Sequence, residues 1–188
     1  MFVFLFFLSF CQRAIGPPHL VRAVAAVQQW STFSVPTPNQ DAISLCLRRA
    51  RDKRYEKFEN YYDYLASEYN RKRTLLCNAL CAAGITPIVP DGGFFVMGDT
   101  SALKIPEQYM LEVTDAMPVS PIPRDWAMSR WMTKEVGVTP IPPSAFYCKE
   151  NVHLASNLLR FAFCKDDETI LQAQKKFEKH FNRVPKNS

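Results

Sequence analysis

The sequence contains no apolar run long enough to cross a membrane. Its longest run occupies residues 1–10, whereas a spanning helix needs about 20 apolar residues. The run has no basic residue before it and no clear small-residue cleavage site, so it matches a secretory signal poorly. A buried strand would have the same composition. We therefore expect a cytoplasmic protein that does not enter the membrane, and the alternative is a secreted protein whose leader is cleaved.

Cysteines and histidines with the spacing of metal ligands are also absent. Of the six cysteines, Cys77 and Cys81 lie one helical turn apart, but neither a second pair nor a suitably spaced histidine completes a zinc site. The cysteines are scattered, mostly among apolar neighbours, which is typical of reduced, buried thiols in a cytosolic protein. We therefore expect no metal.

The sequence lacks a strong excess of one charge as well. Its net charge is +5, and its densest basic runs, at 48–54 and 71–73, lie on helical patterns. Acidic residues interrupt the first run, as they do on a solvated helix face. Because these runs match a nucleic-acid footprint poorly, we expect no nucleic-acid partner. Internal repeats and low-complexity segments are absent too.

The apolar spacing that is present predicts an α/β chain in which two helices precede a mixed region. We expect helices from residue 17, over 37–50, 55–83 and 124–136, and from 166 or 167, with strands over 85–89, 94–97, 138–141 and 159–164. The first two strands flank a Pro-Asp-Gly-Gly turn, which predicts a hairpin. Thr37 and Gln40 have the spacing of a capping box, and Gly84 is expected to end the long helix in the left-handed conformation. Residues 100–123 are expected to be irregular.

Arg160 is the most informative single residue. It lies in the apolar segment Leu-Leu-Arg-Phe-Ala-Phe-Cys at 158–164. Arginine keeps its charge, so a half-buried guanidinium needs an anionic partner, and a carboxylate matches its two parallel donors. The segment alone leaves two interpretations open: a substrate-binding arginine, or a structural arginine that reaches an internal carboxylate or solvent.

Several short motifs occur in an order that resembles one known family. They are Ile-Gly-Pro at 15–17, Val-Pro-Thr at 35–37, the long helix ending in Gly84, Pro-Ile-Val-Pro-Asp-Gly-Gly-Phe-Phe at 87–95, Trp-Met-Thr-Lys at 131–134, Ile-Pro-Pro-Ser-Ala-Phe at 141–146 and Leu-Arg-Phe-Ala-Phe-Cys-Lys at 159–165. The ordered set is similar to the C-terminal half of a kynurenine–oxoglutarate aminotransferase, also called glutamine transaminase or cysteine-S-conjugate β-lyase.

This resemblance implies the α/β architecture of a fold-type I pyridoxal-phosphate enzyme. Residues 1–50 would be the end of the large cofactor domain, with residues 1–14 as an atypical apolar start. Residues 51–188 would be the small C-terminal domain, joined by the long helix. The whole enzyme would be a homodimer that transfers an amino group from kynurenine, glutamine or a related amino acid to a 2-oxo acid.

The resemblance also implies roles for three residues. Arg160 falls at the family's arginine that holds the substrate α-carboxylate, a fixed handle that orients the amino acid over the cofactor. Phe33 falls where the family has an aromatic side chain that reaches into the active site of the partner subunit. Ser34 replaces the histidine that usually follows, which would alter substrate preference.

The lysine with which this family forms a Schiff base to pyridoxal phosphate has no counterpart in the sequence. In the family it comes shortly before Ile-Gly-Pro, and residues 1–12 occupy that place without a lysine. We therefore expect a truncated chain that holds one end of a substrate site, with no catalytic and no cofactor-binding residue of its own. Two functions stay open: a part of a transaminase, or a non-catalytic remnant that binds a carboxylate ligand or a partner subunit.

Overall fold

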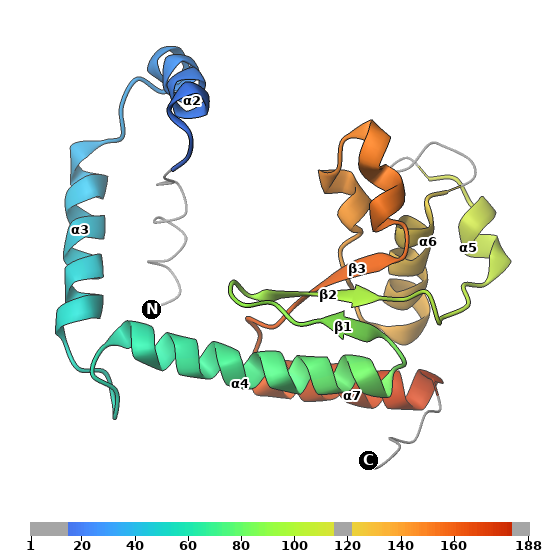
Figure 1. The fold of residues 1–188 in the computed structure, drawn as a ribbon. Coiled ribbons are helices and arrows are strands. Elements are labelled where there is room, and N and C mark those ends of the chain that lie inside the picture. Colours follow the sequence, from blue (N-terminus) through green and yellow to red (C-terminus); the bar gives the residue numbers. More distant parts are fainter. Residues whose placement is uncertain (1–14, 115–121, 182–188) are drawn as a thin grey trace. The chain divides into compact units, whose positions relative to one another are not determined.

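The computed structural model describes residues 15–114 and 122–181 (Figure 1). The chain divides into two compact units, which we call the N-terminal unit (residues 1–65) and the C-terminal unit (residues 66–188). Across the described ranges, no helix is both long and apolar enough to span a bilayer. The apolar run at 1–10 lies outside the described residues, so its predicted role stays a prediction.

Over its described residues, 15–65, the N-terminal unit is mainly helical and has no buried side chain. It contains α2 (Pro18–Ser31), α3 (Thr37–Asp52) and the start of α4 (Tyr61–Ala82). Neither α2 nor α3 has a buried residue. The apolar face expected on α2 is present, yet the side chains along it remain more than half exposed (Leu20, Val24, Val27).

The start of α3 differs by one residue from the prediction. Pro36 is the N-cap and Thr37 is the first helical residue, and no side chain caps this end. The side-chain amide of Gln40 donates to the carbonyl oxygen of Val35 at 2.9 Å instead of closing a capping box. Pro36 has the extended backbone that an N-cap needs, so the cap moves one residue earlier.

The long helix α4 begins at Tyr61, six residues later than predicted. Asn60 Oδ1 accepts the backbone N–H groups of Tyr62 and Asp63 at 2.9 and 3.0 Å. These are the bonds of an asparagine N-cap. The capping asparagine therefore sets the start, although apolar spacing continues upstream.

The end of α4 is as predicted. Gly84 has a φ of 75°. Its N–H donates to the carbonyl oxygen of Cys81 at 2.9 Å, and the N–H of Ile85 donates to that of Leu80 at 3.0 Å. This pair of bonds is a Schellman motif, whose left-handed residue is favourable for glycine.

The C-terminal unit is built around a three-stranded antiparallel sheet in the order β1–β2–β3. β1 (Thr86–Ile88) and β2 (Phe95–Asp99) form the predicted hairpin, and β3 (Leu158–Ala162) pairs with the other edge of β2. The prediction of a strand at 138–141 is wrong, because this segment meets β3 only through the bridge between Ile141 and Arg160. Prolines at 140, 142 and 143 remove the donors that a longer ladder would need.

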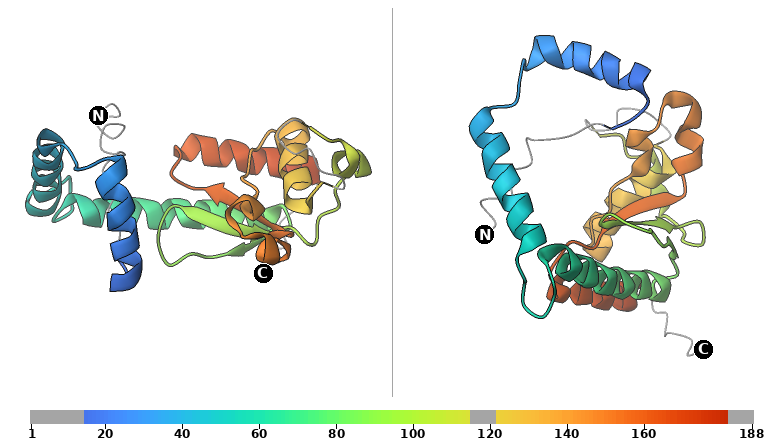
Figure 2. Two further views of the ribbon diagram at one scale, coloured as in Figure 1. Left: turned by 90° about the horizontal axis from the view of Figure 1, so that it is seen from above. Right: turned by 60° about the vertical axis from the view of Figure 1, so that its left-hand side comes forward.

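Helices and short turns complete the C-terminal unit. Figures 1 and 2 show α4 and α7 (Asp167–Phe181) side by side. The helix predicted over 124–136 is present as α6 (Arg124–Trp131), continued by a π-helical turn η1 (Met132–Val136). The prediction that 100–123 is irregular is wrong for α5 (Glu107–Leu111), and 115–121 lie outside the described residues. Two 3-10 segments, η2 (Pro143–Phe146) and η3 (Lys149–Ala155), precede β3.

One hydrophobic core fills the C-terminal unit. Because side chains alternate along a strand, Val96 on β2 and its cross-strand partner Phe161 on β3 are both buried in this core. Met97 and its partner Arg160 lie on the opposite, half-buried face. Other elements contribute further large core side chains, among them Leu76, Leu80, Met128, Met132, Ile170 and Phe177.

The described cysteines of this unit lie mostly outside the core. The prediction that they are buried is wrong for Cys81, Cys148 and Cys164, which are exposed, whereas Cys77 is partly buried.

Candidate carboxylate-binding site

Arg160 lies at the middle of β3, on the face of the sheet away from the core. Its backbone is fixed on both sides: it pairs with Met97 of β2, and it exchanges two backbone hydrogen bonds of 2.9 Å with Ile141. The backbone under this guanidinium is therefore paired on both sides, although β3 is an edge strand of the sheet.

Two aromatic rings enclose the guanidinium of Arg160. Its Cζ lies 4.2 Å from the centre of the Phe95 ring and 4.5 Å from that of the Phe146 ring. Phe95 is on the same face of β2, diagonally across from Arg160. A guanidinium stacked on ring faces keeps its charge and loses rotational freedom, while its in-plane donors remain available.

No anion pairs with Arg160 among the described residues. Its side chain takes part in no ion pair and no hydrogen bond, and its Nε is buried without a partner. The two terminal nitrogens also lack partners but are not among the buried atoms, so they remain accessible. The structural interpretation requires a bond from Arg160 to a carboxylate of its own fold. The described part of the chain contains no such bond.

The other described arginines of the C-terminal unit are all engaged. Asp167 and Glu68 accept hydrogen bonds from Arg71 and raise the pKa of its guanidinium. Arg124 donates to backbone and hydroxyl oxygens of Thr100 and to a further carbonyl, and burial lowers its pKa. Arg73 and Arg130 donate to carbonyl oxygens at 2.7 Å. Arg160 is thus the one described guanidinium in this unit that makes no side-chain hydrogen bond and no ion pair.

Phe33 and Ser34 belong to the N-terminal unit, after the end of α2. Phe33 is 84% exposed and has a φ of 63°, an unfavourable value for an aromatic residue. The N–H of Ser34 donates to the carbonyl oxygen of Thr32 at 2.8 Å, which closes a tight turn. Their substrate-binding roles remain predictions.

Phe95 and Phe146 were not predicted as site residues. The signal for Phe95 is its position two residues before Met97, which the hairpin register places opposite Arg160. Phe146 ends the Ile-Pro-Pro-Ser-Ala-Phe motif, but only the three-dimensional structure brings that motif against β3.

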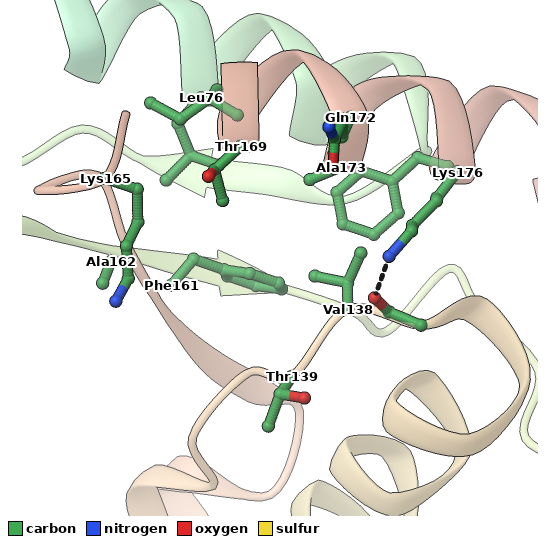
Figure 3. A pocket seen from close by; sticks show the side chains of 13 residues that line it. Leu76, Val138, Thr139, Phe161, Ala162, Lys165, Thr169, Gln172, Ala173 and Lys176 are labelled. Carbon is green, nitrogen blue, oxygen red and sulfur yellow. Dashed lines mark hydrogen bonds between the residues drawn. The ribbon is translucent and has the colours of Figure 1, made fainter. Parts of the chain in front are cut away.

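A separate cavity of about 260 Å³ lies between β3 and α7, and Arg160 does not line it. Figure 3 shows Lys165 and Lys176 at its two ends, with Phe161 and Val138 between them. The ammonium group of Lys176 donates to the carbonyl oxygen of Gly137 at 2.8 Å. This cavity is therefore distinct from the aromatic-lined guanidinium.

The described lysines do not fit the role of a cofactor-binding lysine. None of them is buried. The most enclosed, Lys72, donates to the carbonyl oxygen of Lys165 at 2.7 Å and lies 4.0 Å from a carboxylate oxygen of Asp167. An amine that reacts with a carbonyl is instead desolvated and unpaired. The described lysines therefore offer no amine suited to hold pyridoxal phosphate.

The fold is that of the fold-type I aminotransferases, as the likeness to Bna3p from Saccharomyces cerevisiae illustrates. The TM-score is 0.67 at 29% sequence identity, over 88% of this chain and 37% of that one. The chain belongs to the aminotransferase class I and II family, whose model matches residues 13–177. Members of this family are generally dependent on pyridoxal phosphate.

The curated relatives have names that agree with the predicted resemblance. The chain is 40% identical over 159 residues to a kynurenine–oxoglutarate transaminase of Dictyostelium discoideum, which covers 85% of this chain and 35% of the relative. It is 34% identical to kynurenine–oxoglutarate transaminase 3 of Rattus norvegicus over 87% of this chain and 34% of that protein. The resemblance is confirmed, and the chain spans about a third of the length of these relatives.

Proposed function

We propose that this chain supplies the carboxylate-binding end of an aminotransferase active site, with Arg160 as the binding residue. The ligand is the α-carboxylate that an amino acid and a 2-oxo acid have in common. The observation that carries this proposal is a guanidinium held between two aromatic rings, with no anion partner among the described residues. Its accessible terminal nitrogens match the two oxygens of a carboxylate.

The names of the relatives support a narrower proposal for the whole protein. Because they are kynurenine–oxoglutarate transaminases, we propose kynurenine or a related amino acid such as glutamine as the amino donor and a 2-oxo acid as the acceptor. Arg160 binds the carboxylate of each in turn, so that the carbon beside it has one fixed orientation. The described lysines do not fit the residue that would hold pyridoxal phosphate.

We also propose a domain division and a role for the turn after α2. Residues 1–50 would complete a large domain, and residues 51–188 would form the small domain. In a homodimer, the exposed ring of Phe33 would reach the active site of a second copy, with Ser34 beside it. The exposure of Phe33 and its constrained backbone support this role, because a projecting ring needs a rigid base.

A ligand titration of the full chain tests the role of Arg160. Addition of 2-oxoglutarate, followed by two-dimensional NMR, is expected to shift signals around β3 with a dissociation constant on the order of millimolar, because one ion pair at an open site supplies only a few kcal/mol. Arg160→Gln is expected to weaken binding at least about tenfold, and Arg160→Lys less, because lysine keeps the charge but loses the fork.

Arg71→Gln is the matched control, since Asp167 and Glu68 already engage that guanidinium. It is expected to leave the dissociation constant unchanged. Equal binding by wild type and Arg160→Gln would contradict the proposal.

The alternative function, a non-catalytic module that binds a carboxylate, is favoured by one observation: the described lysines are exposed or engaged. Incubation with pyridoxal phosphate and borohydride, followed by peptide mapping, distinguishes the two. A single modified lysine together with amino transfer would exclude the module, whereas carboxylate binding without either would favour it.

A further inference from the structure

The two rings that enclose Arg160 are held in different ways. Phe95 is part of β2, and the ladder between β2 and β3 fixes its position. Phe146 lies outside the sheet at the end of η2 and is 64% exposed. Its own burial is too small to hold it over the guanidinium, so its position depends on what anchors η2.

Side chains of α6 anchor η2 at Ser144. The backbone N–H of Ser144 donates to Asp125 Oδ2 at 2.9 Å, and its Oγ accepts a hydrogen bond of 3.0 Å from Trp126 Nε1. A third bond from α6, from Ser129 Oγ to the carbonyl oxygen of Pro140 at 2.7 Å, fixes the start of the segment. The segment that ends in Phe146 is therefore held by α6 at two points, Pro140 and Ser144.

Asp125 is an unusual anchor. Its side chain is completely buried, and its Oδ1 accepts no hydrogen bond. No ion pair involves this carboxylate among the described residues. Burying a carboxylate without a cation is costly, and its place in the first turn of α6 offsets only part of that cost. The bond from the Ser144 N–H is the one hydrogen bond that this side chain makes among the described residues.

We propose that Asp125 is a positioning residue for Arg160. Through Ser144 it fixes η2, and η2 places Phe146 over the guanidinium. The part of this inference that concerns ligand affinity rests on the proposed function, whereas the placement of Phe146 does not. The two parts are therefore tested by separate measurements on the full chain.

The first measurement uses the Arg160 Nε–H signal without ligand, assigned by its loss in Arg160→Lys. Stacking between two rings is expected to shift this proton upfield. Asp125→Ala should move it toward the position of an unstacked arginine, as Phe146→Ala does. Asp125→Asn should restore most of the upfield shift, because its amide oxygen can accept the Ser144 N–H.

The control for general destabilisation is Leu80→Ala, which truncates a buried core side chain on α4 and removes no hydrogen bond of α6 or η2. It should lower the melting temperature and leave the Arg160 signal in place. An Arg160 signal that stays in place in folded Asp125→Ala would overturn the inference. Should Asp125→Ala not fold, Asp125→Leu is measured instead, because leucine fills a similar space and cannot accept the Ser144 N–H; an unmoved Arg160 signal there would overturn the inference equally.

The second measurement is the affinity for 2-oxoglutarate. A displaced ring leaves the guanidinium less well oriented, so Asp125→Ala should bind about tenfold more weakly than wild type. If Asp125 acts through Phe146, the double variant Asp125→Ala/Phe146→Ala should bind no more weakly than Phe146→Ala alone. Additive losses in affinity would contradict a route through Phe146.

The two proposals fail by different results. Absence of Arg160-dependent binding in wild type would refute the proposed function, and the Arg160 Nε–H signal without ligand would still decide the positioning role of Asp125.

Discussion

The N-terminal and C-terminal units make opposite use of the same kinds of residues. Both contain amphipathic helices, but every buried hydrophobic residue of the described chain belongs to the C-terminal unit. In the N-terminal unit, large apolar side chains such as Leu20, Val27 and Trp30 remain exposed. The difference shows that apolar periodicity is enough to form a helix and that a core needs a second surface.

The two units divide between residues 65 and 66, whereas the proposed domain division falls between residues 50 and 51. Exposed apolar helix faces are typical of elements that pack against another surface, and the chain spans about a third of the length of its curated relatives. The C-terminal unit has its own sheet, its own core and the candidate site. We therefore expect stability and ligand binding to depend on the C-terminal unit, and substitutions in the two units to differ sharply.

The largest expected difference comes from truncating one leucine in each unit. Leu80 is fully buried in the core, whereas Leu20 on α2 is 56% exposed. Leu80→Ala should lower the free energy of unfolding by about 2–5 kcal/mol, and Leu20→Ala should change it by less than about 0.5 kcal/mol. Urea unfolding followed by circular dichroism measures both. Similar losses for the two variants would mean that the N-terminal unit has a core after all.

A smaller effect is expected from adding one methyl group inside the sheet. A Cβ at Gly98 would lie 2.6 Å from Ile85 Cγ2, whereas a Cβ at Gly92, in the hairpin turn, would meet nothing within 4 Å. Gly98→Ala should therefore lower the free energy of unfolding by about 1–3 kcal/mol, and Gly92→Ala should leave it nearly unchanged. Ile85→Val keeps Cγ2, so Gly98→Ala should cost as much free energy of unfolding in that background as in wild type. Ile85→Ala removes Cγ2, so adding Gly98→Ala to it should cost less.

The smallest expected effect is a pH dependence of the melting temperature, and we expect it from a carboxylate of the C-terminal unit alone. The hydrogen bond from Arg71 lowers the pKa of Asp167. A carboxyl whose pKa is lowered on folding stabilises the protein above its unfolded pKa, about 4, and this contribution is lost as the pH falls through the folded value. Asp167→Asn should thus melt below wild type at pH 6, and the gap should close below about pH 4.

Asp52 of α3 is the matched control for this pH dependence. Its pKa is also lowered, by the hydrogen bond from Arg51, but this pair joins adjacent residues on an exposed helix. Asp52→Asn should leave the melting temperature unchanged across the same pH range. A pH-dependent gap for Asp52→Asn would contradict the contrast between the units.

Much of the fold could be predicted because its signals are local. Gly84 and the Pro-Asp-Gly-Gly turn act within a few residues, so the end of α4 and the hairpin are as expected. The start of α4 was missed because the Asn60 cap competes with apolar spacing that continues upstream. The expected strand at 138–141 is only one bridge, since its prolines lack the donors for a ladder.

The candidate site could be predicted only in part, because most of its residues come from segments that are distant in the sequence. Arg160 is a charged residue in an apolar strand, so its sequence context alone suggests that it binds an anion. Its aromatic neighbours come from β2 and η2, and Asp125 from α6. These positions lie far from Arg160 in the sequence, and only the pairing of the strands and the hydrogen bonds of α6 bring them together.

The most direct test of the central claim follows the arginine Nε–H signals of the wild-type chain during a titration with 2-oxoglutarate. The Arg160 signal should shift and saturate, while those of Arg71, Arg73, Arg124 and Arg130 should stay in place because terminal nitrogens of these guanidinium groups already donate to protein oxygens. A titration in which the Arg160 signal does not move, or moves no more than those four, would contradict a carboxylate-binding role for this residue.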